Sequence, residues 1–149
     1  MNRMLVATCT LLAALQAPAS LEAQSRSTAP SSIEAARLVG TFNTAVALGR
    51  NSCTGVTVQP MPTIVTPTTM DTTIVLTHAN ISHRGSIKPS GVFHTSEISL
   101  GSAPTTYHVS MKGVFTSVDA FTALVTVREV TNGAERCSYE VQWVGTRAK

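Results

Sequence analysis

The stretch from His78 to His94 is the part of this chain where histidines are most frequent. Three histidines lie there with Arg84 and Lys88, and the longer run 72–96 contains no acidic residue. Such side chains bind anions, and histidines do so more strongly once they are protonated, below about pH 6.5. The alternative is a solvated, weakly basic connection. The residues that we expect in an anion site are His78, His83, Arg84, Lys88 and His94.

The same histidines lack the spacing of a metal site. His78 and His83 are five residues apart, so they would lie on opposite faces of one strand and meet only through a bend. A zinc or copper site would have to add His94 or His108 from further along the chain. The cysteines do not show the paired spacing of zinc ligands either. We therefore expect no metal and no cofactor.

Side chains for covalent or acid–base catalysis are scarce. The chain has no Gly-x-Ser-x-Gly nucleophile elbow, and neither Cys53 nor Cys137 has an activating base beside it. Glu129 and Glu140 fall in one predicted hairpin, but on opposite parities and therefore on opposite faces. We assign no catalytic residue, and a secreted hydrolase without a recognisable motif stays an alternative.

A gap between two small residues raises the possibility of an apolar pocket. Gly113 is expected to lie opposite Ala123 in a strand pair, with both facing inward. Either a large neighbour fills this gap or it forms the mouth of a small cavity, as in a lipocalin-like carrier. The residues of this possible pocket are Met111, Gly113, Ala123 and Trp143.

The N-terminus has the order of a secretory signal peptide. Arg3 provides a positive start, residues 4–15 are uncharged and mostly apolar, and small residues follow at Ala17, Ala19 and Ala23. We expect cleavage after Ala23, with a cut after Ala19 as the alternative, and a secreted or periplasmic protein. The apolar run is too short to span a membrane, which takes roughly 20 residues, so we expect no transmembrane segment in the mature chain.

Removal of residues 1–23 takes Cys9 with it and leaves two thiols. In an oxidising compartment, Cys53 and Cys137 most simply form one disulfide. It would close a loop of about 85 residues and contribute on the order of 4 kcal/mol in the chain-entropy description.

The mature chain should hold one domain. Residues 24–35 are expected to be a flexible leader, in which Ser31 and Glu34 resemble a capping box before a single helical turn. Residues 36–149 are expected to form one β domain, because Thr and Val are frequent and hydrophobicity alternates with a period of two. The net charge of +3 is modest and the aromatic residues fall at core positions, so we expect no nucleic acid partner.

The first half of the domain predicts four strands. The first has residues 38–48 with alternate side chains inward, and 53–59 form the second. The third, 63–66, is flanked by prolines and is expected at a sheet edge or in a loop. The fourth, 72–77, contains a continuous apolar run and is expected to be covered on both faces.

The C-terminal third predicts a three-stranded antiparallel meander over 107–115, 121–127 and 137–145, with the odd-numbered residues inward. Asn132 and Gly133 resemble a two-residue hairpin turn. That turn would pair odd with even residues and put the two apolar sets on opposite faces, so we expect a three-residue loop instead, over 131–133 or 132–134. The first loop would pair Val127 with Cys137.

Together these patterns predict an all-β fold, an antiparallel β-sandwich or a small, partly closed β-barrel of about eight short strands. The function that we favour is a non-enzymatic, exported protein that binds a ligand or partner or belongs to the cell envelope. An anionic glycan or a cell-envelope component is the expected partner, and a carrier of a small apolar ligand is the main alternative.

Overall fold

The computed structural model describes residues 33–149. The expected signal peptide 1–23 and most of the expected leader lie outside these residues. Within 33–149, no helix is long and apolar enough to cross a membrane. The elements are a short 3-10 helix and nine strands: η1 (Ala35–Leu38), β1 (Gly40–Asn51), β2 (Met61–Pro67), β3 (Thr73–His78), β4 (Ile81–Ile87), β5 (Val92–Thr95), β6 (Ile98–Ser102), β7 (Thr105–Ser117), β8 (Ala120–Thr131) and β9 (Ala134–Arg147).

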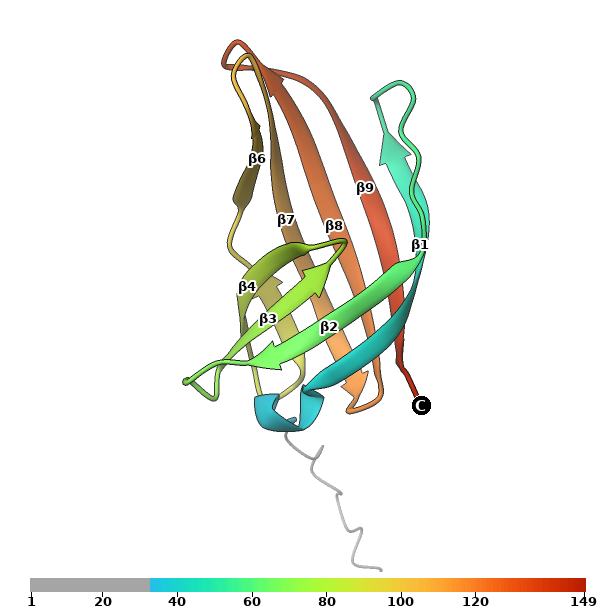
Figure 1. The fold of residues 1–149 in the computed structure, drawn as a ribbon, viewed down its shortest axis with the longest axis vertical. Coiled ribbons are helices and arrows are strands. Elements are labelled where there is room, and N and C mark those ends of the chain that lie inside the picture. Colours follow the sequence, from blue (N-terminus) through green and yellow to red (C-terminus); the bar gives the residue numbers. More distant parts are fainter. Residues whose placement is uncertain (1–32) are drawn as a thin grey trace, which may run out of the picture.

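The strands form a closed antiparallel barrel (Figure 1). The hydrogen-bonded order is β5-β4-β3-β2-β1-β9-β8-β7-β6, and a further pairing of β5 with β7 closes a ring of eight strands. β6 is the extra strand and pairs with residues 105–109 of β7, whereas β5 pairs with residues 112–114. The all-β prediction is therefore confirmed, and of its two architectures the barrel is the one observed.

In the C-terminal meander, the alternation of apolar and polar residues correctly predicts which side chains face inward. β7, β8 and β9 pair consecutively, and Gly113 lies opposite Ala123 as expected. The buried residues of these strands are the odd-numbered ones. Because the apolar set is inward and the polar set outward on all three strands, one face of this long sheet bounds the interior of the barrel.

The β8–β9 turn corrects the prediction of a three-residue loop. Asn132 and Gly133 form a two-residue turn with φ of 54° and 79°, as type I′ turns require. Parity is restored by a register shift between Glu129 and Val130, where one strand takes an extra residue. The parity argument was thus right about the extra residue and wrong about its place. The resulting inward pairs are Glu129–Cys137, Val127–Tyr139, Val125–Val141 and Ala123–Trp143.

Three further predictions for the first half are wrong in detail. Residues 53–59 form no strand. β2 is not an edge strand, since it lies between β1 and β3; its prolines occupy the ends of the strand, where fewer ladder bonds are lost. β3 is not covered on both faces: Ile74 and Leu76 are buried, but Val75 faces outward and is half-buried.

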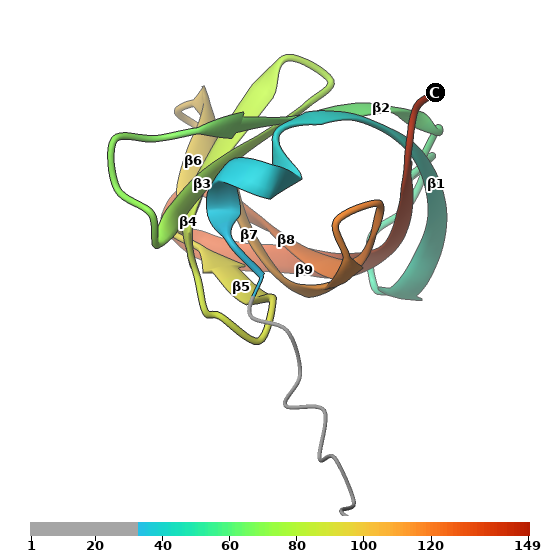
Figure 2. The ribbon, with the colours of Figure 1, turned by 90° about the horizontal axis from the view of Figure 1, so that it is seen from below.

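The lower half of the barrel is filled by aromatic residues. Phe42, Phe93, Phe115 and Phe121 are at most 1% exposed, and their rings lie 5.3–5.9 Å apart. η1 lies across this end of the barrel (Figure 2) and buries Leu38 and Ala35, which we had placed in the first strand and the leader. Glu34 is its N-cap residue and makes no side-chain cap bond. We call the four phenylalanines, together with Leu38 and Ala35, the lower core.

Arg147 fastens the lower end of the barrel. Its guanidinium donates hydrogen bonds to the carbonyls of Arg37, Val39 and Val118 and to the carboxylate of Asp119. It also lies 4.9 Å from the ring centroid of Phe42. One side chain thus joins β9 to the C-terminal end of η1 and to the β7–β8 turn.

We expect Arg147→Lys to lower the unfolding free energy by about 2 kcal/mol, because an ammonium cannot reproduce the fork of donors. Arg50→Lys is the matched control, since Arg50 pairs with Glu140 at the surface and its side chain is 86% exposed. Urea titration should show a clear loss for the first variant and almost none for the second. Equal losses would contradict this role for Arg147.

Cys53 and Cys137 form the expected disulfide, across 84 residues of sequence. It lies at the upper end of the barrel, where Cys53 follows β1 and Cys137 belongs to β9. Ser52 and Ser138 are also bonded to one another there through backbone and hydroxyl groups. The segment 52–60 is therefore held against β9 at the point where it leaves β1.

Candidate functional site

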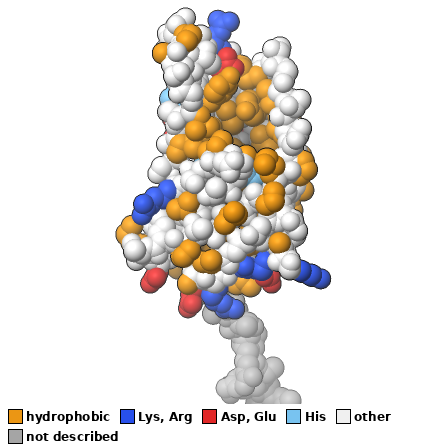
Figure 3. Space-filling model, viewed as in Figure 1, with side chains coloured by type: hydrophobic (Ala, Val, Ile, Leu, Met, Phe, Trp, Pro, Cys, Tyr) orange, Lys and Arg blue, Asp and Glu red, His pale blue; other side chains and the backbone are white. Residues whose placement is uncertain are grey.

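The upper half of the barrel contains an apolar cavity of about 520 Å³, which we call the cup. In Figure 3 hydrophobic side chains gather in a hollow in the upper half of the molecule. The residues that line the cup are Val46, Thr57, Val58, Gln59, Met61, His78, Ala79, Ile81, His83, Leu100, Tyr107, Val109, Val125, Val127, Tyr139, Val141 and Trp143.

The cup exists because the strands differ in length. β1, β7, β8 and β9 have 12 to 14 residues, whereas β2, β3 and β4 have six or seven. The short strands cover only the lower half, so the inner face of the long strands is left uncovered above them (Figure 1). The segment 52–60 and β6 border this open part, and Val58 and Leu100 line it from there.

A tight hairpin brings two histidines into the cup. Ala79 and Asn80 form the β3–β4 turn, with φ of 50° and 63°, and His78 pairs with Ile81. Because the turn has two residues, the even-numbered side chains of β3 and the odd-numbered side chains of β4 face the interior of the barrel. His78 and His83 therefore both face inward, and this hairpin is the bend that the sequence spacing required.

His78 is fixed on two sides. Its ring stacks on Trp143 with centroids 4.1 Å apart. Its Nδ1 is 2.9 Å from the hydroxyl of Thr63, which is in turn 2.8 Å from the buried hydroxyl of Thr44. This chain of hydroxyl groups holds the imidazole against the wall of the cup.

His83 is the more deeply buried of the two, with 4% of its surface exposed. Its Nδ1 is buried and has no hydrogen-bond partner among the described residues. Burial lowers the pKa of both histidines below the ordinary value of 6.5, and the neighbouring His78 lowers the pKa of His83 further. The neutral imidazole is thus the favoured form of each.

These shifts predict a loss of stability on mild acidification. The unfolded chain takes up protons near pH 6.5 that the folded histidines resist, so the unfolding free energy should fall as the pH decreases from 6.5 to 5. The pKa values of Glu97 and Glu140 are lowered below 4.5 by their Arg partners, so these groups titrate outside that window. Urea titrations at several pH values would measure the slope.

His83→Leu should flatten that slope, whereas His94→Gln is the control, because His94 faces outward and contacts Ser86. A wild-type unfolding free energy that stays constant between pH 6.5 and 5 would contradict the assignment of buried, neutral histidines.

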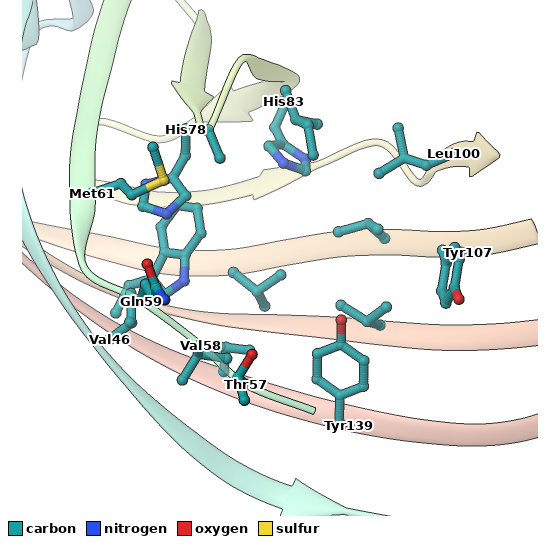
Figure 4. Close-up of a pocket in the computed structure, with 17 residues that line it drawn as sticks. Val46, Thr57, Val58, Gln59, Met61, His78, His83, Leu100, Tyr107 and Tyr139 are labelled. Carbon is teal, nitrogen blue, oxygen red and sulfur yellow. The ribbon is translucent and has the colours of Figure 1, made fainter. Parts of the chain in front are cut away.

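Two tyrosines extend the polar part of the lining. Tyr107 on β7 and Tyr139 on β9 lie on the same side of the cup, with the hydroxyl of Tyr139 directed into it (Figure 4). Burial raises the pKa of Tyr139, and nearby Tyr107 and Glu129 raise it further. Its hydroxyl therefore stays protonated and can donate a hydrogen bond.

The structure divides the residues that we expected in an anion site. His78 and His83 line the cup, whereas Arg84 and His94 face outward, and Lys88 follows the end of β4 and is exposed. The five side chains do not form one cluster. Anion binding stays a prediction that would now concern only the outward-facing members.

The possible pocket at Gly113 is filled from within. A Cβ placed on Gly113 would lie 2.6 Å from Cζ of Phe93 and 2.8 Å from Cβ of Ala123. Phe93 thus occupies the gap on the inner side, while Gly113, Ala123 and Trp143 also border an open depression that includes Val92, Val114 and Val144. Of the four residues expected there, Trp143 lines the cup, and Met111, Gly113 and Ala123 belong to the wall below it.

No acid–base pair stands out in the described part of the chain. Glu140 is bound to Arg50, and Glu129 lies beside Cys137. The group of His, Cys, Asp and Glu side chains within 33–149 that is close enough for a metal consists of Cys53, Glu129 and Cys137. Its two sulfurs are joined in the disulfide, so neither is available as a thiolate ligand.

Sequence reasoning missed most of the cup. Residues 57–59 were expected in a strand, and Tyr107, Val109, Val125, Val127 and Val141 were expected to face the core. Their alternation did indicate that they face inward. Whether an inward face meets other side chains or an open space depends on the lengths of the opposite strands, which alternation does not encode.

The fold and the site define a class: a closed, eight-stranded antiparallel barrel that is packed at one end and carries an open apolar cup at the other. Comparison with protein-family models, with curated proteins and with solved structures finds no significant match to this chain. Its function is therefore argued from the geometry of the cup.

Proposed function

We propose that this protein binds a small, mainly apolar ligand in the cup, and does so outside the cytoplasm. The observation that carries the proposal is the 520 Å³ cavity whose wall is formed by Val109, Val125, Val127 and Val141. Of the functions considered from the sequence, the carrier of a small apolar ligand is the one that this geometry favours.

The size and the chemistry of the cup support this reading. Sites for small molecules have volumes of roughly 300–1,000 Å³, with mostly apolar walls and a few polar groups. Eight-stranded barrels either fill their interior with side chains or hold one small ligand. Here the lower core follows the first pattern and the cup follows the second. A disulfide and the expected signal peptide support an oxidising compartment.

The test uses N-phenyl-1-naphthylamine, a neutral dye that fluoresces in apolar surroundings. We expect saturable binding to the wild type, and we expect Val127→Trp to abolish it, because Val127 lies within the cup and the indole would fill it. Thr126→Trp is the control, since Thr126 is the neighbour on β8 and faces outward. Both variants should keep the wild-type circular dichroism spectrum.

If the wild type does not bind the dye, or if both tryptophan variants lose it equally, the cup is not a binding site of this kind. If the dye does bind to the cup, competition by unlabelled alcohols and alkyl ethers ranks these ligands without reference to the dye's own chemistry.

A further inference from the structure

We propose that the ligand is a neutral amphiphile whose head group is a hydroxyl, and that this hydroxyl donates a hydrogen bond to Nε2 of His78. This inference rests on the proposed function and adds the chemistry of the head group. It follows from the hydrogen bonds behind His78, the unpartnered nitrogen of His83 and the absence of charge in the lining.

The hydrogen bonds behind His78 determine which of its nitrogens carries the proton. Each threonine hydroxyl has one proton to donate. The hydroxyl of Thr44 donates to the carbonyl of Phe42 and must therefore accept from Thr63. Thr63 has then used its proton and accepts from Nδ1–H of His78. Nε2 of His78 is left as a hydrogen-bond acceptor, so it selects a donor on the ligand.

His83 provides the complementary group. Its buried Nδ1 lacks a partner among residues 33–149, although a buried polar atom without a hydrogen bond is costly. His83 lines the cup together with His78. A hydroxyl is both donor and acceptor, so a head group that donates to Nε2 of His78 keeps lone pairs that can accept from a second donor in the lining.

The lining of the cup offers no cationic side chain that could pair with an anionic head group. Among the described residues that line the cup, none is Asp, Glu, Lys or Arg. The titratable groups that line the cup together with His78 are His83 from β4, Tyr107 from β7 and Tyr139 from β9, and Glu129 lies near Tyr139. A carboxylate there would lose its hydration without meeting a cation, which is unfavourable.

The experiment compares octan-1-ol with heptyl methyl ether by calorimetry at pH 7.5. The two molecules are isomers, and only the alcohol has a proton to donate. One hydrogen bond corresponds to a preference for the alcohol of about three- to tenfold. Octanoate, which has the same chain length, should bind more weakly than either.

His78→Phe should reduce the preference to about one, because phenylalanine keeps the ring packing on Trp143 and removes the acceptor; the readout is the ratio of the two affinities within the variant. The wild type alone gives a second measurement, which does not depend on how the variant folds. The preference for the alcohol should decline only once the pH falls below the lowered pKa of His78, since protonated His78 cannot accept a hydrogen bond.

Equal affinity for the alcohol and the ether in the wild type would overturn the head-group assignment and leave the apolar site standing. Tighter binding of octanoate, or a preference that increases as the pH falls, would overturn it in favour of an acidic ligand. Failure of both octanol and the ether to bind, together with failure of the dye, would instead overturn the proposed function.

Discussion

Phe115→Ala is expected to cost about 3–5 kcal/mol of unfolding free energy, the largest effect of any single substitution considered for this protein. Phe115 is 1% exposed, and its ring contacts those of Phe42, Phe93 and Phe121. Truncation would remove these contacts and leave a cavity in a part of the barrel that η1 closes from below.

Val127→Ala is the matched control for this prediction. Val127 is also buried, but its side chain lines the cup, where space is already open. Its truncation should cost about 1.5 kcal/mol or less, because only the transfer of two methyl groups is lost. Urea titration monitored by Trp143 fluorescence would measure both. Similar losses would show that the lower core and the cup are packed alike.

The second large effect is expected from removal of the disulfide. Cys53→Ser with Cys137→Ser frees a loop of 84 residues in the unfolded chain, which corresponds to a loss of about 4 kcal/mol in the chain-entropy description and 2–5 kcal/mol in practice. The substitution also releases the segment 52–60, from which Thr57, Val58 and Gln59 line the cup. Binding of N-phenyl-1-naphthylamine should therefore weaken as well.

Reductant distinguishes the disulfide from the serine substitutions themselves. Dithiothreitol should lower the stability of the wild type to that of the double-serine variant and leave the variant unchanged. A wild type that is insensitive to reductant under conditions that reduce Cys53 and Cys137 would show that the bridge contributes little to stability.

Much of the fold was predictable because it depends on local pattern. Alternation assigned the inward faces of β7, β8 and β9, and it required one extra residue near the β8–β9 turn. It did not locate that residue. Asn132 and Gly133 adopt positive φ readily, so the turn keeps two residues and the bulge falls beside it. An extra residue in the turn and an extra residue in a bulge beside it both keep the apolar residues of β8 and β9 on one face. The alternation of apolar residues alone could therefore not choose between these two positions.

The site was predictable only in fragments. The histidines were singled out, but His78 and His83 were grouped with Arg84 and His94, from which the barrel wall separates them. Trp143 was placed in a pocket, but beside Gly113, where the ring of Phe93 already fills the space. In both cases the residue types were informative, and their grouping depended on contacts between strands distant in the sequence.

The sequence by itself determined the all-β class, the pairing of Cys53 with Cys137, the inward faces of the long strands and the unusual density of histidines after β3. Composition and period depend only on neighbours along the chain, and the two cysteines outside the expected signal peptide allow one pairing. Tertiary structure decided that the sheet closes into a barrel, that the short strands leave an open cup above the lower core, and that the β3–β4 turn directs His78 and His83 into it. These outcomes depend on strand length and register around the whole ring, which no local segment of the chain specifies.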